Sequence, residues 1–71
     1  MSKFNIEISS VPDRNKLVAE IWHEKDLIAE INQERDHLEI ELYPLQRITL
    51  DYQEFLKILE TAKNKLIGYV K

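Results

Sequence analysis

The chain has 71 residues, a net charge of −3 and no cysteine, so it is predicted to form one small domain without disulfides or thiolate metal sites. The acidic balance argues against a nucleic-acid ligand, because phosphates require clustered Lys and Arg. No apolar run approaches the ~20 residues that span a bilayer, and the first residues lack the apolar segment of a signal peptide, so a cytoplasmic location is expected.

The first two thirds of the chain show the period-two alternation of apolar and polar residues that is typical of β-strands. Four strands are expected, at about residues 4–8, 16–23, 27–33 and 38–43, and polar segments separate them. Pro44 is expected to end the last strand, since proline cannot donate to a strand ladder.

A helical period begins after Asp51, which is predicted to cap the helix, with Glu54 completing a capping box. Apolar side chains at helical spacing then share one face, and they are Phe55, Leu56, Leu59, Ala62 and Leu66. Gly68 suits the position just after a helix end. The predicted helix therefore covers about residues 52–67.

Consecutive strands joined by short segments favour an antiparallel meander. The predicted fold is α+β, with a three- to four-stranded antiparallel meander and one C-terminal amphipathic helix packed on one face, in a single domain over residues 1–71. One long helix over the second and third strands is the alternative. It is disfavoured because Leu17, Ala19 and Ile21 recur every two residues, as do Leu27, Ala29 and Ile31.

Acidic residues are concentrated in residues 17–43, which carry eight acidic and two basic side chains, whereas the remainder of the chain is slightly basic. Matching the buried faces of neighbouring strands fixes the register. With a three-residue loop at Glu24–Asp26, this register pairs Ala19 with Ile31, Ile21 with Ala29, Ile31 with Ile40 and Ala29 with Leu42. On the outer face it predicts a row of Glu20, Glu30 and Glu41, a second row of Trp22, Ile28 and Tyr43, and Glu39 opposite Asn32.

Three interpretations of these aligned carboxylates remain open. They could form a solvated sheet face, a site for a divalent cation, or a docking surface for Lys and Arg of another protein, with aromatic anchors. A flat, exposed face is a poor cage for a cation, so no metal site is predicted. The predicted partner-binding residues are Glu20, Glu30, Glu41, Glu39, Trp22, Tyr43 and Ile28.

No catalytic signature is present, so the chain is not expected to be an enzyme or to bind a cofactor. His23 and His37 lie at or beside predicted loops, and neither has a neighbouring nucleophile motif or metal-ligand spacing. A phosphate-cradling loop cannot be built around Gly68 alone.

Several segments carry a resemblance to a known group of proteins. They are Leu17-Val-Ala-Glu-Ile-Trp, Ile28-Ala-Glu-Ile-Asn-Gln-Glu and Leu38-Glu-Ile-Glu-Leu-Tyr-Pro, followed by a helix ending Ala62-Lys-Asn-Lys-Leu. From Ile6 to Leu66 the chain resembles small bacterial immunity proteins of contact-dependent growth-inhibition and other polymorphic toxin systems. The resemblance implies a cytoplasmic protein that binds and neutralises a cognate toxin domain, often a basic nuclease. The alternative is a small homo-oligomeric structural or interaction domain with no toxin partner.

Overall fold

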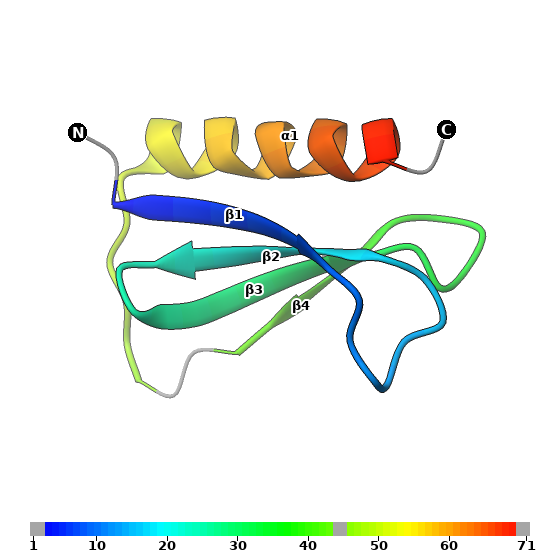
Figure 1. The fold of residues 1–71 in the computed structure, drawn as a ribbon. Helices are drawn as coiled ribbons and strands as arrows, with labels where there is room; N and C mark the ends of the chain where they lie inside the picture. The colour runs from blue at the N-terminus through cyan, green and yellow to red at the C-terminus, as the bar shows by residue number, and fades with distance from the viewer. Residues whose placement is uncertain (1–2, 44–45, 70–71) are drawn as a thin grey trace.

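The computed structural model describes residues 3–43 and 46–69, which form a four-stranded antiparallel sheet followed by one helix (Figure 1). The elements are β1 (Phe4–Ser9), β2 (Val18–His23), β3 (Asp26–Asn32), β4 (Glu39–Leu42) and α1 (Tyr52–Tyr69). The strands lie in chain order, β1-β2-β3-β4, so the predicted α+β meander with a C-terminal helix is confirmed. Pro44, which was predicted to end the last strand, lies outside the described residues.

The register derived from the buried faces is confirmed over most of the sheet. Ala19 pairs with Ile31 and Ile21 with Ala29, and across the next ladder Ile31 pairs with Ile40, Ala29 with Leu42 and Asn32 with Glu39. Odd-numbered apolar residues of β2 and β3 therefore share one face with the even-numbered apolar residues of β4. This agreement follows from the rule that a one-residue slip would move every buried side chain to the other face.

The prediction was wrong at the β2–β3 hairpin. The turn contains two residues rather than three, because His23 pairs with Asp26 and Glu24 adopts a left-handed φ of 56°. The register set by this turn differs by one residue from the register of the Ile21–Ala29 pair. A β-bulge absorbs the difference, so Trp22 pairs with Leu27 instead of Ile28.

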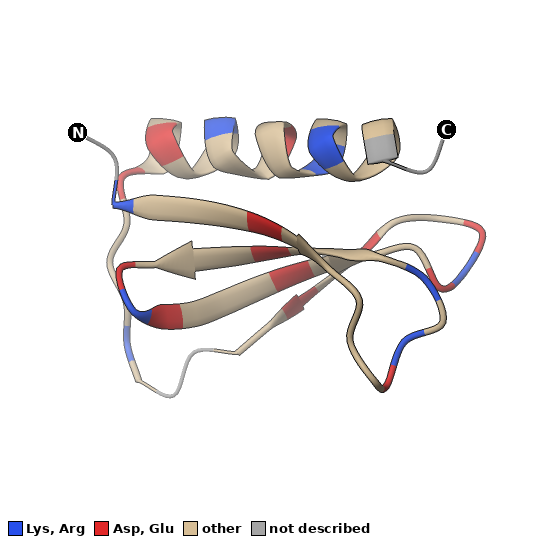
Figure 2. Cartoon of the chain, in the orientation of Figure 1, with Lys and Arg blue, Asp and Glu red and all other residues tan. Residues whose placement is uncertain are grey.

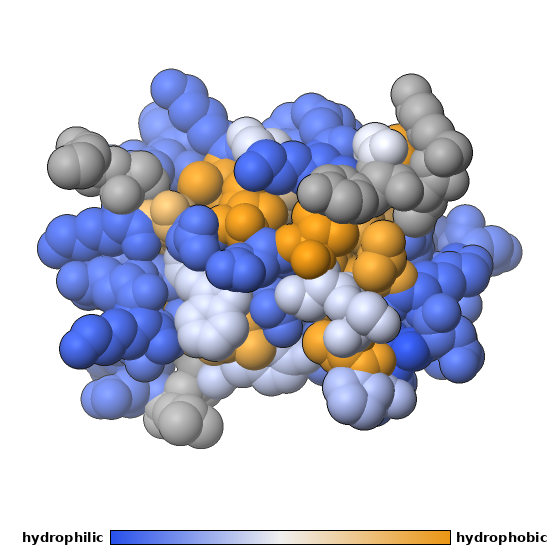
Figure 3. Space-filling view, viewed as in Figure 1, coloured by the Kyte–Doolittle hydropathy of each residue, from blue (hydrophilic) through white to orange (hydrophobic). Residues whose placement is uncertain are grey.

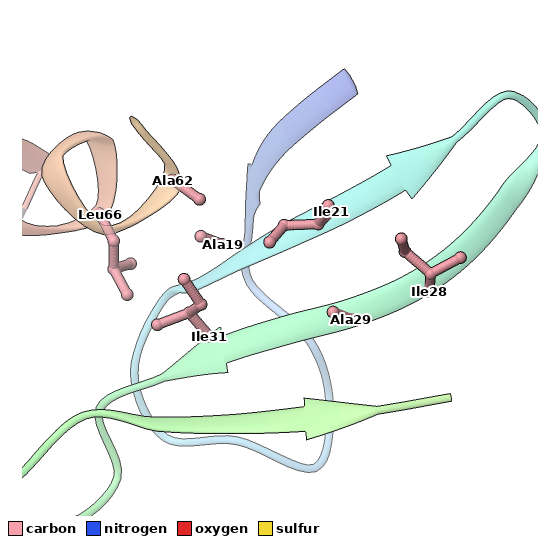
Figure 4. Close-up of a cluster of buried hydrophobic side chains, with 7 residues drawn as sticks. All are labelled: Ala19, Ile21, Ile28, Ala29, Ile31, Ala62 and Leu66. Carbon is pink, nitrogen blue, oxygen red and sulfur yellow. The ribbon is translucent and has the colours of Figure 1, made fainter. Parts of the chain in front are cut away.

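The bulge changes the environment of Ile28, which is the additional residue on β3. Ile28 is only 5% exposed and belongs to the buried hydrophobic cluster that contains Ile21 and Ala29 (Figure 4). The predicted outer row of Trp22, Ile28 and Tyr43 is therefore interrupted at its central position.

The core lies between α1 and the sheet. Ala62 and Leu66 of α1 point toward Ala19, Ile21 and Ile31 in the close view (Figure 4). The helix packs mainly on β1 and β2, and apolar side chains gather where it meets the sheet, with polar side chains around them (Figure 3). β3 still contributes Ala29 and Ile31 to this core, whereas Ile40 and Leu42 of β4 remain exposed.

The ends of the helix follow the sequence prediction in part. The Glu54 amide donates to Asp51 Oδ2 at 2.8 Å, so Asp51 is the N-cap as predicted. At the other end α1 continues through Gly68 to Tyr69, and Gly68 has no positive φ. The predicted helix end at Gly68 was wrong, because a glycine is permitted in the left-handed conformation of a helix end but is not obliged to adopt it.

Replacing Leu66 with alanine should lower the free energy of unfolding by about 2–5 kcal/mol, because the side chain is fully buried and its loss leaves a cavity. Urea denaturation followed by circular dichroism measures the change. Leu56→Ala on the same helix is the matched control, since Leu56 is 43% exposed, and it should lose less than about 1 kcal/mol. Equal losses in the two variants would contradict this assignment of the core.

Candidate functional site

A row of glutamates crosses the outer face of the sheet, with one residue on each strand. Glu7 pairs with Glu20, Glu20 with Glu30 and Glu30 with Glu41. Figure 2 shows acidic segments in red on all four strands. The predicted row of three is confirmed and extended by Glu7. The sequence does contain the signal for Glu7, because inward-facing Ile6 and Ile8 require Glu7 between them to point outward.

Arg14 neutralises the centre of this glutamate row. Its Nε and Nη2 atoms both lie 2.9 Å from Glu30 Oε2, and Nη2 also donates to Glu41 Oε1 at 3.0 Å. The side chains of Arg14 and Glu30 are only 18% and 6% exposed. Burial by itself would lower the pKa of Arg14, but attraction and hydrogen bonding to Glu30, reinforced by Glu41, outweigh it and raise that pKa. The guanidinium is therefore permanently charged at this position.

Arg14 belongs to the loop between β1 and β2 (Figure 1), and its Nη2 atom reaches Glu41 on β4. The Arg14 amide donates to the Val11 carbonyl at 3.2 Å, which closes a turn before the guanidinium. Beyond it, the amides of Asn15 and Lys16 donate to the two carboxylate oxygens of Glu34 at 3.0 and 2.9 Å. Glu34 thereby ties this loop to the segment that joins β3 and β4. The first of these bonds is the main cause of the lowered pKa of Glu34.

The hydroxyl of Tyr43 is hydrogen-bonded to both Glu30 and Glu41. This hydroxyl lies 2.5 Å from Glu41 Oε1 and 3.2 Å from Glu30 Oε1, and its single proton is shared between the two acceptors. Burial, the hydrogen bond to Glu41 and the two negative charges all raise the pKa of the phenol. Tyr43 therefore remains a neutral donor in the physiological range.

The remaining carboxylates of the row have weaker internal partners. Ser9 Oγ and Trp22 Nε1 both donate to Glu20 Oε1, at 3.1 and 3.4 Å. Asn5 Nδ2 lies 3.5 Å from Glu7 Oε1. Both hydrogen bonds to Glu41 also end on Oε1, whereas Glu30 uses both of its oxygens. Over residues 3–43 and 46–69, one oxygen on each of the three outer carboxylates thus accepts no hydrogen bond and retains its acceptor capacity.

The structure brings most of the predicted partner-binding residues together on one face. Trp22 is hydrogen-bonded to Glu20, Tyr43 is hydrogen-bonded to Glu30 and Glu41, and Ile28 is separated from both groups in the core. Glu39 lies at the edge of the row, with its Oε2 3.6 Å from Arg35 and 3.4 Å from His37. Sequence reasoning missed Arg14, because no periodicity links a loop residue to the strands it reaches.

Two further properties concern metals and membranes. Over residues 3–43 and 46–69, no group of three or more His, Cys, Asp or Glu side chains is arranged to hold a metal ion. The helix in that part of the chain is not apolar enough over a sufficient length to cross a bilayer.

Comparison with protein families, with curated proteins and with solved structures found no match to this chain.

Removing Arg14 should destabilise the fold, because it leaves the carboxylate of Glu30 buried without a counter-ion. Arg14→Met is expected to lower the urea midpoint clearly, and the double variant Arg14→Met/Glu30→Met should recover part of that loss. Arg35→Met is the control, since Arg35 is well exposed beside Glu39 and its removal should have little effect. A midpoint for Arg14→Met equal to that for Arg35→Met would show that the buried pair contributes nothing.

Glu34 should make stability depend on pH in the acidic range. Its pKa is lower in the folded state than its ordinary value of 4.5, so its contribution is complete above that value and disappears as the pH falls through the folded pKa. The difference in unfolding free energy between the native chain and Glu34→Gln should therefore be largest near neutral pH and shrink steadily below pH 4.5. Chemical denaturation at several pH values measures it, and a difference that does not change with pH would contradict the hydrogen-bonding account.

Proposed function

We propose that this protein binds a basic surface of another protein through the glutamate row, and that it acts as an immunity-type inhibitor of a cognate toxin domain in the bacterial cytoplasm. A basic nuclease domain is the class of toxin that best matches an acidic inhibitor face. The protein would act by occupying or covering the basic surface and would itself perform no chemistry.

The spare acceptor capacity of the outer carboxylates is the observation that supports this proposal. The row itself contains four glutamates, and Arg14, which lies among them, is already bonded to Glu30 and Glu41. Opposed side chains in neighbouring strands lie about 5 Å apart, where like charges destabilise the sheet. Lys or Arg from a partner would relieve this repulsion while using the free oxygens of Glu7, Glu20 and Glu41.

The aromatic side chains contribute to the same face. Trp22 and Tyr43 are both partly exposed, and each donates to a carboxylate of the row, so their orientation is set before a partner arrives. Partly buried aromatic residues with fixed orientations are frequent hot spots of protein interfaces. Charge complementarity would add speed and selectivity of encounter.

The test uses the products of the two reading frames that flank this gene. One of them should be toxic when expressed alone, and co-expression of this chain should restore growth. Purified proteins should form a complex that is measurable by calorimetry. Removing the charges with Glu7→Gln/Glu20→Gln/Glu41→Gln should weaken that complex by about tenfold or more.

A control variant separates the face from the overall charge. Glu24→Gln/Asp26→Asn/Asp36→Asn removes the same charge from exposed positions at or beside the turns, and it should bind like the native chain. Glu30 is left unchanged in both variants, because Arg14 depends on it. Absence of a complex with either flanking product, or equal weakening by the two triple variants, would overturn the proposal.

A further inference from the structure

We propose that the open edge of β4 receives an extended segment of the partner protein, in which apolar and basic residues alternate. The apolar side chains would lie on the helix side against Ile40 and Leu42, and the basic ones on the outer side against Glu39 and Glu41. This inference deepens the proposed function, on which it rests, by naming the recognition element on the partner.

The backbone of β4 is arranged to accept another strand. Among the strands of the described chain, none lies beyond β4, so its far side is an edge of the sheet. The Tyr43 amide donates to the Ile28 carbonyl at 2.9 Å. Because ladder bonds alternate along an antiparallel strand, the amides of Ile40 and Leu42 point away from β3 toward the open edge. An added strand would find donors and acceptors there.

The side chains on the helix side of β4 offer an apolar surface. The helix packs mainly on β1 and β2, which leaves Ile40 47% and Leu42 62% exposed. A groove of about 250 Å³ runs between β4 and α1. Its walls include Leu38 and Leu59, and Lys63 on its rim is already held by Glu60 at 2.9 Å. The groove therefore suits apolar side chains.

The outer side of β4 selects for positive charge. Glu41 is 51% exposed, its two hydrogen bonds from described residues both end on Oε1, and Glu39 lies two residues away on the same face. A strand paired with β4 would place its outward side chains directly opposite these carboxylates, where opposite charges attract. Because apolar and acidic residues alternate along β4, a strand that pairs with it should alternate apolar and basic residues.

A second copy of this chain fits the same edge poorly. Antiparallel pairing that sets Ile40 against Leu42 of the second copy also sets Glu41 against its own equivalent. The glutamate row would then run through both sheets, and opposed like charges destabilise such a pairing. Charge therefore favours a basic partner segment over self-association.

The test uses three synthetic peptides with the native protein. The first is acetyl-Lys-Ile-Lys-Val-Lys-Ile-amide, and the other two carry Thr or Glu in place of Lys. In nuclear magnetic resonance titrations the Lys peptide should shift the amides of residues 39–42, with nuclear Overhauser contacts to Ile40 and Leu42. It should bind about tenfold tighter than the Thr peptide, and the Glu peptide should not bind.

Variants of exposed positions show whether the edge itself is used. Ile40→Lys/Leu42→Lys should abolish binding of the Lys peptide, while Ile48→Lys, at another exposed apolar residue, should leave it unchanged. Glu39→Gln/Glu41→Gln should remove the advantage of the Lys peptide over the Thr peptide. Binding elsewhere on the sheet, or none, would overturn the inference. So would self-association in sedimentation experiments that Leu42→Lys abolishes, because a second copy would then be the occupant.

These outcomes are separate from those of the flanking-product experiment. If a flanking product binds through Glu7, Glu20 and Glu41 but the peptides ignore β4, only the edge inference fails. If no flanking product binds, the proposed function fails, whatever the peptides do.

Discussion

The buried ion pair between Arg14 and Glu30 is the contact on which the outer face of this protein depends. Four glutamates aligned across a sheet repel one another, and Arg14 places a positive charge within their row. By also reaching Glu41, the same guanidinium joins the β1–β2 loop to the last strand. Tyr43 donates to the same two carboxylates, so the loop, β3 and β4 meet in one polar cluster. Val18 and Asn32 on this face are also buried.

On the other face of the sheet, the single helix is narrower than the four strands it packs against. Four strands spaced about 4.8 Å apart form a layer wider than one helix about 10 Å across, so one helix cannot cover the sheet. The helix is centred on β1 and β2, and Figure 4 shows β4 lying away from it. The apolar pattern of β4 still matches that of β3, with Ile40 opposite Ile31 and Leu42 opposite Ala29. Ile40 and Leu42 therefore lie on the core side of the sheet but remain about half exposed, because the helix does not cover them.

The sequence was sufficient to predict the meander, the helix and most of the register, because each depends on a repeating pattern in neighbouring residues. It was insufficient at the β2–β3 hairpin, because the left-handed conformation of Glu24 shortens the turn and the bulge then moves Ile28 into the core. The ion pair between Arg14 and Glu30 could not be predicted from the sequence, for a different reason. It joins a loop to a strand sixteen positions away, and no local pattern records that distance. Glu7 was within reach, since the alternation in β1 already places it on the outer face.

The offset of the helix also has a consequence for the dynamics of the sheet. A segment's resistance to local opening depends on the packing that opening would disrupt, and β4 is a four-residue strand supported chiefly by β3. The β4 amides that face β3, those of Glu39 and Glu41, are therefore expected to exchange with solvent through local detachment, whereas the bonded amides of β2 and β3, between two paired neighbours, require opening of the whole domain. The strand that is proposed to receive a partner is thus also the least firmly held, and association would be linked to the ordering of that edge.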